Sequence, residues 1–194
     1  MPKVTFFSVA VLLSLSLSAL ASDVCDDLWF ARNSIMNQSG YCFSSNLGQK
    51  TFDNSDCHTK HPALTKSNRN RVAEIMSVER AFSCEIDTTK SDLDIHLFTI
   101  RKTLTVQPLN DGAESSCIGY NGAEQVPLYS DTDSSSEIIG FILPGDDLGY
   151  DHNPYSDTRP GWFFVSSVSY GGISKPVLGW TNSKALNQCD DFAG

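Results

Sequence analysis

The chain has 194 residues, a formal net charge of −9 at neutral pH and 40% hydrophobic residues. Its length accommodates one medium domain or two small ones. The acidity argues against nucleic acid or anionic lipid as partner, because the chain has no basic stripe to release phosphate counterions. The charge is uneven: residues 22–84 carry seven acidic and seven basic side chains, whereas residues 85–194 carry sixteen acidic and six basic ones. This shift predicts two units of different surface character.

The first 21 residues have the features of a secretory leader. Lys3 supplies a positive charge, an apolar core extends to Leu20, and Ala19-Leu20-Ala21 fits the small-x-small cleavage rule. The apolar run is too short for a comfortable membrane span. We therefore expect cleavage after Ala21 and a periplasmic or secreted mature protein without a membrane span.

The mature chain contains an even number of cysteines, which predicts disulfides and an oxidising compartment. Four fall in its first third and two bracket its last third: Cys25, Cys42, Cys57, Cys84, Cys117 and Cys189. This spacing predicts two separately cross-linked units.

Residues 22–84 are predicted to form a small helical domain. Its first helix, over 24–39, has apolar residues at three- and four-residue steps, namely Leu28, Ala31, Ile35 and Met36. Gly40 stands where a left-handed cap is expected. A short helix over 46–52 and a third over 68–81 follow. Three short helices make a thin core, which disulfides commonly reinforce.

The segments Leu28–Ile35 and Gly40–Phe43, together with Leu47 and Phe52, resemble the YARHG-type domain of bacterial secreted and envelope proteins. The resemblance covers about residues 24–60. The stretch that names the family is replaced here by Met36–Gly40, in which only the glycine is kept. The resemblance implies a compact helical extracytoplasmic module. We expect its Trp29, Phe30 and Arg32 to have structural roles rather than to bind a ligand.

Residues 117–194 are predicted to be all-β. Short apolar runs predict strands over 117–120, 126–129, 137–143, 161–165 and 177–181. Pro144-Gly145 follows the third strand, Gly171-Gly172 turns between the last two, and residues 182–186 resemble a single helical turn.

Several of these runs resemble the bacterial type of Src-homology-3-like barrel over residues 117–189: Val126–Tyr129, Ile138–Asp146, Gly161–Val165 and Leu178–Thr181. The stretch from Gly149 to Arg159 is longer than usual. The resemblance implies a groove for peptides, often of the cell wall, lined by aromatic rings. The candidate ligand-binding residues are Tyr129, Tyr150, Tyr155, Trp162 and Trp180. Both tryptophans are expected in the core, which leaves the loop residues Tyr150 and Tyr155 as the stronger candidates.

The predicted fold class is thus α+β, a disulfide-stapled helical domain followed by a small Src-homology-3-like β-barrel. The connecting segment, residues 85–116, fits a helical period through Leu93, Leu97, Ile100 and Leu104 and also fits strand alternation, so both readings stay open. It is too apolar for a free linker and is expected to pack on one unit or bridge both.

The division into two units leads to a hypothesis for the cysteine pairing. Cys117 and Cys189 flank the barrel, whose first and last strands can lie close together. Nested pairing in the helical unit joins Cys42 to Cys57 and Cys25 to Cys84. Each disulfide would stabilise the fold by about 3 to 4.5 kcal/mol on a chain-entropy estimate.

Catalytic signatures are absent from the sequence. His58 and His61 offer a His-x-x-His spacing without a third metal ligand, and no nucleophile or phosphate-binding motif occurs. We expect no enzymatic activity, no metal and no cofactor. The expected function is that of a binding module for a peptide, a cell-wall component or another envelope protein. The alternative is a structural or inhibitory protein that acts by protein–protein contact through its acidic C-terminal unit.

Overall fold

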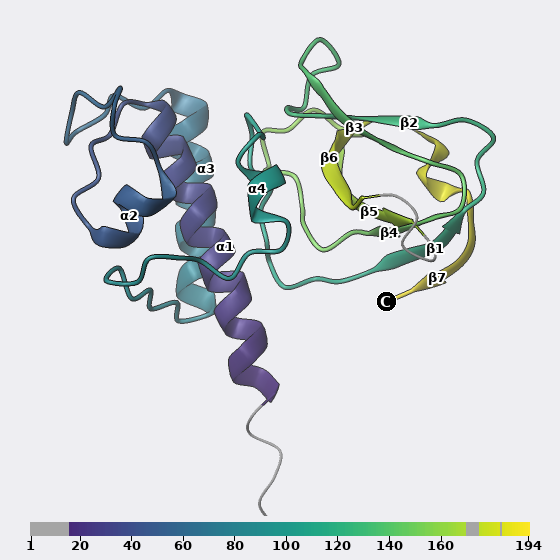
Figure 1. The fold of residues 1–194 in the computed structure, drawn as a ribbon, viewed down its shortest axis with the longest axis horizontal. Coiled ribbons are helices and arrows are strands. Elements are labelled where there is room, and N and C mark those ends of the chain that lie inside the picture. The colour runs from purple at the N-terminus through teal and green to yellow at the C-terminus, as the bar shows by residue number, and fades with distance from the viewer. Residues whose placement is uncertain (1–15, 170–174, 183) are drawn as a thin grey trace, which may run out of the picture.

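The computed structural model describes residues 16–169, 175–182 and 184–194 and shows a helical part beside a β-rich part (Figure 1). The helices are α1 (Ser16–Gln38), α2 (Asn46–Thr51), α3 (Lys66–Ala81), α4 (Phe98–Arg101) and the 3-10 turn η1 (Lys184–Asn187). The strands are β1 (Ser116–Tyr120), β2 (Val126–Tyr129), β3 (Ile138–Ile142), β4 (Asp146–Gly149), β5 (Phe163–Ser169), β6 (Val177–Thr181) and β7 (Cys189–Ala193). Most of the predicted leader and the Gly171-Gly172 turn lie outside the described residues. Within the described residues, no helix combines the length and apolarity that crossing a membrane requires.

Helices α1 and α3 pack against each other through the predicted apolar faces. Leu28 and Ile75 are fully buried between them, whereas Met76 of α3 is exposed. Thr65 caps α3 by accepting a hydrogen bond from the Asn68 amide at 3.1 Å. Gly40 has φ +79° at the end of α1, so the left-handed cap is confirmed.

Aromatic rings fill the space between α1 and α2. The ring centroids of Phe43 and Phe52 lie 4.7 Å apart, and Phe30 stacks on Phe52 at 5.7 Å. Trp29 is buried in the same cluster, and Arg32 pairs with Glu79 of α3 at 2.9 Å. The residues that could suggest a ligand site in this unit therefore have structural partners.

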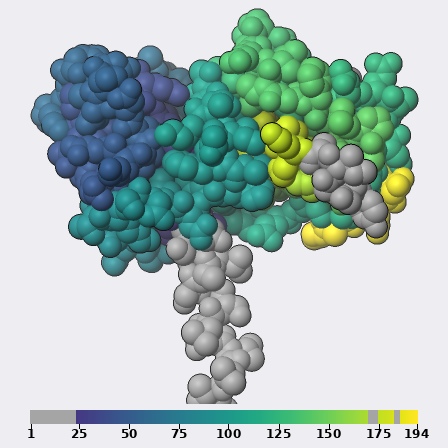
Figure 2. All heavy atoms as spheres, viewed as in Figure 1, coloured from purple at the N-terminus to yellow at the C-terminus, as the bar shows by residue number. Residues whose placement is uncertain are grey.

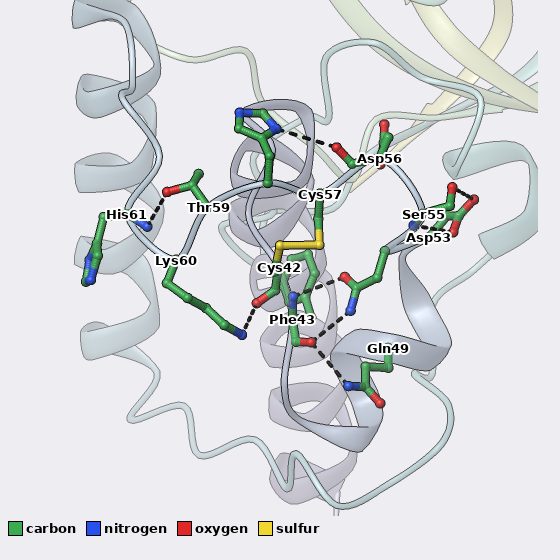
Figure 3. Close-up of a disulfide and its surroundings, with 12 residues drawn as sticks. Cys42, Phe43, Gln49, Asp53, Ser55, Asp56, Cys57, Thr59, Lys60 and His61 are labelled. Carbon is green, nitrogen blue, oxygen red and sulfur yellow. Dashed lines mark hydrogen bonds between the residues drawn. A yellow bond between two sulfur atoms is a disulfide. The ribbon is translucent and has the colours of Figure 1, made fainter.

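Three disulfides cross-link the chain: Cys25–Cys84, Cys42–Cys57 and Cys117–Cys189. They are the pairs proposed from the sequence, and every cysteine of the described residues takes part in one. Cys42–Cys57 holds the loop after α1 against the loop after α2 (Figure 3). Phe43 is fixed beside it, because its amide donates to Asn54 Oδ1 and its carbonyl accepts from Gln49 Nε2.

The seven strands form one antiparallel sheet in the order β3-β2-β6-β5-β4-β1-β7. No ladder joins the edge strands β3 and β7 in the described part of the chain, so the sheet is open and the expected closed barrel is not observed. Two strands were not predicted. Asp146–Gly149 resembles a turn in the sequence, and the acidic segment Cys189–Ala193 adds β7 outside β1, the strand to which Cys189 is bonded.

The connecting segment, residues 85–116, bridges the two units and is mostly irregular apart from the single turn α4. Leu93 and Ile95 pack in the aromatic cluster of the helical unit. Leu104 packs instead with Trp162 and Trp180 of the sheet. Figure 2 shows this segment, in teal, between the blue helical unit and the green β unit. The segment therefore bridges both units instead of packing on one of them.

Candidate functional site: an aromatic cleft in the β unit

The β unit contains an open cleft of about 950 Å³. The loop before β5, the start of β5, the turn η1 and the last strand β7 surround it. We call it the aromatic cleft because five rings line it: Tyr150, Trp162, Phe163, Phe164 and Phe192.

Two of these rings are held at the surface by the strands that carry them. Side chains alternate along a strand, so burial of Trp162 and Phe164 turns Phe163 outward. Phe163 is 47% exposed, and Phe192, in β7, is 58% exposed. Exposed apolar side chains gathered around one hollow are more informative than scattered ones, because contiguous apolar patches mark interaction sites. The cleft therefore offers apolar area at little entropic cost to a ligand.

Tyr150 forms a fixed wall of the cleft. Its hydroxyl donates to the Leu186 carbonyl at 3.2 Å, and burial raises the pKa of Tyr150 to about 12. The phenol thus stays neutral at physiological pH. Glu114 and Arg159, of opposite charge, lie among the polar residues of the lining.

The cleft brings together two of the five predicted ligand-binding residues, Tyr150 and Trp162. Tyr129 contacts Trp162 edge-to-face at 5.8 Å but is not part of the lining. Trp180 is fully buried, and its indole Nε1 donates to the Val106 carbonyl at 2.7 Å. The sequence did not reveal Phe163 and Phe192, although alternation in the run Trp162–Val165 could have placed Phe163 on the outer face.

Tyr155 lies elsewhere, although its loop position made it a strong candidate. The loop folds back onto the helical unit, where Tyr155 is only 3% exposed among Leu28, Ile35 and Ile75. The next two residues hold the loop on α3, because Ser156 hydrogen-bonds Glu74 and Asp157 forms an ion pair with Arg71. Tyr155 therefore joins the two units and does not face the cleft.

A buried charge cluster, which reaches the cleft through His152, joins three distant segments of the chain. Asp27 of α1 accepts hydrogen bonds from Arg101 of α4, at 2.5 Å from Nη2 and 3.0 Å from Nη1. His152, which also lines the cleft, places Nε2 2.5 Å from Asp27 Oδ2. Its Nδ1 lies 3.0 Å from Asp151 Oδ1, and Arg101 Nε donates to Gln107 at 2.9 Å.

Asp27 stabilises both cationic side chains of this cluster, whereas Arg101, with Nη1 3.0 Å from His152 Nε2, opposes the imidazolium. Burial opposes ionisation of Asp27, but Arg101 and His152 outweigh it and hold the pKa of that carboxyl well below its usual range. Burial likewise disfavours the imidazolium of His152, yet Asp27 and Asp151 raise the pKa of His152 above its ordinary value. The cluster thus favours Asp27 as carboxylate and His152 as imidazolium.

In the described residues, no group of three or more histidine, cysteine or acidic side chains is arranged to hold a metal ion. His58 and His61 are both exposed. The site consists of an apolar cleft whose lining includes the ion-paired His152.

Comparison with known proteins adds two matches. Residues 6–80 match the YARHG domain, which confirms the resemblance proposed for the first unit. Residues 83–194 match DUF4453, described as a domain of unknown function. No curated protein and no solved structure matches the chain. Because the second match covers more than half of its length, the chain belongs to the DUF4453 family, with a YARHG domain in front of it.

Proposed function

We propose that the protein is a non-enzymatic extracytoplasmic binding module that takes a peptide into the aromatic cleft of its β unit. The observation that carries the proposal is the cleft itself, whose lining combines two large exposed rings, Phe163 and Phe192, with two buried ones, Trp162 and Phe164. Pockets of this volume with an apolar lining and few polar groups are typical ligand sites. The cell wall and the envelope supply the peptides that such a module meets.

Two further observations support an extracytoplasmic binding role. Three disulfides fit an oxidising compartment. The resemblance of residues 117–189 to bacterial Src-homology-3-like domains, whose ligands are commonly peptides, supports a peptide rather than a small metabolite. The strand motifs carry this resemblance, and the open sheet departs from it.

The test is binding of peptidoglycan fragments and of a peptide library to the oxidised mature chain. We expect Phe163→Ala and Phe192→Ala each to weaken binding about tenfold, because an aromatic anchor in a binding site typically contributes more than 1 kcal/mol. Phe141→Ala is the matched control, since Phe141 is an exposed ring of β3 outside the cleft lining. Binding that survives both cleft substitutions unchanged would exclude this site.

A further inference from the structure

We propose that the free edge of β7 is the docking strand for the ligand, and that the ligand is an extended basic segment of another protein. This inference rests on the proposed function and deepens it. An apolar side chain of the added segment enters the aromatic cleft, and a basic side chain two residues away faces Asp190. Main-chain hydrogen bonds to an exposed sheet edge are a general mode of peptide recognition.

Within the described residues, the backbone of β7 has a partner strand on one side only. β7 is the last strand of the sheet order and pairs there with β1, with Phe192 opposite Cys117 and Asp191 opposite Ile118. Consecutive residues of an antiparallel strand direct their amides alternately toward and away from the partner. The Phe192 amide donates to Asp191 Oδ1 at 2.9 Å, which indicates that it lies on the free side. An added strand would replace this carboxylate as the acceptor.

The cleft opens beside this same residue. Phe192 lines the cleft and is the most exposed large hydrophobic side chain of the described residues. Asp190 lies two residues earlier, on the same face of the strand, and is exposed. A strand paired with β7 would therefore lie next to the aromatic cleft at Phe192 and next to the carboxylate of Asp190, with one residue between the two. This spacing matches the side-chain period of an extended segment.

The acidic residues on and near β7 favour a basic partner over a second copy of this chain. Asp190 and Asp191 lie in β7, Glu114 lines the adjacent cleft, and residues 85–194 carry sixteen acidic against six basic side chains. A second copy of this chain docked on the edge would place these aspartates against their own counterparts. Such like-charge pairing is unfavourable, whereas lysine or arginine at these positions is attracted. The other edge strand, β3, carries no carboxylate between Ile138 and Ile142.

The test uses a synthetic peptide of about seven residues in which threonine alternates with one phenylalanine and two lysines, as suits a strand with side chains on alternate faces. Three probes are titrated into the oxidised mature chain by calorimetry. They are this peptide, the same peptide with glutamate in place of lysine, and the lysine peptide with N-methyl groups on alternate amides. N-methylation removes the donors that a strand needs and leaves the side chains in place.

We expect the lysine peptide to bind at least tenfold more tightly than the glutamate and N-methylated peptides. Its affinity should fall with added salt and with Asp190→Asn or Phe192→Ala, and Phe141→Ala should leave it unchanged. Equal binding of the N-methylated peptide would overturn strand addition and leave the cleft proposal standing. Preference for the glutamate peptide, or for neutral library peptides that still require Phe163, would overturn the basic partner. Absence of binding by all three, with no Phe163-dependent ligand in the library, would overturn both proposals.

Discussion

Asp27 lies in helix α1, yet its carboxylate is bonded by residues that follow it by 74 and 125 positions, Arg101 and His152. The Asn110 side chain adds a further hydrogen bond at 3.3 Å. Because Asp27 and Arg101 are both buried, each needs the other to offset the cost of leaving water. Through these contacts, Asp27 links the helical unit to the connecting segment and to the β unit.

Replacing Asp27 by asparagine should destabilise the protein by about 3 to 5 kcal/mol, because it leaves the guanidinium of Arg101 buried without a counter-charge. The measurement is urea denaturation of the oxidised chain followed by tryptophan fluorescence. Asp56→Asn, an exposed carboxylate on the Cys42–Cys57 loop, is the control and should leave the midpoint nearly unchanged. Equal midpoints for the two variants would show that the charge cluster contributes no stability.

His152 predicts a pH dependence with a defined sign. Its pKa is raised in the folded state, so the folded protein holds a proton that the unfolded chain has already released. The resulting stability is fully present below the unfolded pKa of about 6.5 and is lost as the pH rises through the raised folded value. Denaturation midpoints measured across this range should fall with pH. His152→Gln should remove that slope, whereas the exposed-site control His61→Gln should retain it.

At the scale of elements, a helix or strand could be predicted from the sequence where the local residue pattern determines its structure. The α1 stripe of Leu28 and Ile35 follows the helical period, and Gly40 marks its end, so the second part of α1 and its cap were predictable. The start of α1 at Ser16 was not, because the sequence assigns those residues to the leader. Strand β4 was not, because Asp146-Asp147 reads as a polar turn. Its stability comes from pairing on both sides, with β1 and β5, and from the Ser167 hydroxyl that donates to Asp146 at 2.7 Å.

The candidate site shows the same limit. Tyr150 and Trp162 could be proposed because aromatic residues in a β unit are expected near a groove. The charge cluster could not, because its members come from three segments that only the tertiary fold brings together. The sequence offered one hint: Arg101 is among the few basic residues of residues 85–194 and directly follows the apolar Ile100.

The disulfides stabilise elements that are otherwise short. On the chain-entropy estimate, removing Cys42–Cys57 by a double serine substitution should cost about 3 kcal/mol, and removing Cys25–Cys84, which closes a longer loop, about 4 kcal/mol. Denaturant midpoints of the two double variants would check this order. Peptide mapping without reduction should first recover the three linked pairs in the wild-type chain. A Cys25–Cys42 peptide would contradict the nested pattern.

At the scale of the whole molecule, the connecting segment gives the β unit part of its core. Leu104 packs on Trp162 and Trp180, and the Val106 carbonyl accepts the indole hydrogen bond of Trp180. The boundary between the two family matches, at residues 80–83, keeps this segment with the β unit. The β unit therefore includes the connecting segment as well as the seven strands.

A fragment of residues 83–194 should accordingly fold with a cooperative thermal transition, whereas a fragment of residues 117–194 should expose Trp162 and Trp180 and aggregate. Calorimetry and size-exclusion chromatography of the two oxidised fragments would test this. Both fragments retain Cys117 and Cys189, and Cys84, which has lost its partner Cys25, is replaced by serine in the longer one, so the comparison isolates the connecting segment. A soluble, cooperative shorter fragment would show that residues 83–116 are dispensable for the β unit.

The nested disulfides have a consequence for export. A chain that enters an oxidising compartment from its N-terminus presents Cys25 and then Cys42, which are not partners, long before Cys84 arrives. Oxidation in order of arrival would join these two and trap the helical unit in a non-native form. We therefore expect a host that oxidises thiols without isomerising them to yield mispaired chains, and a disulfide isomerase to restore the nested pairs.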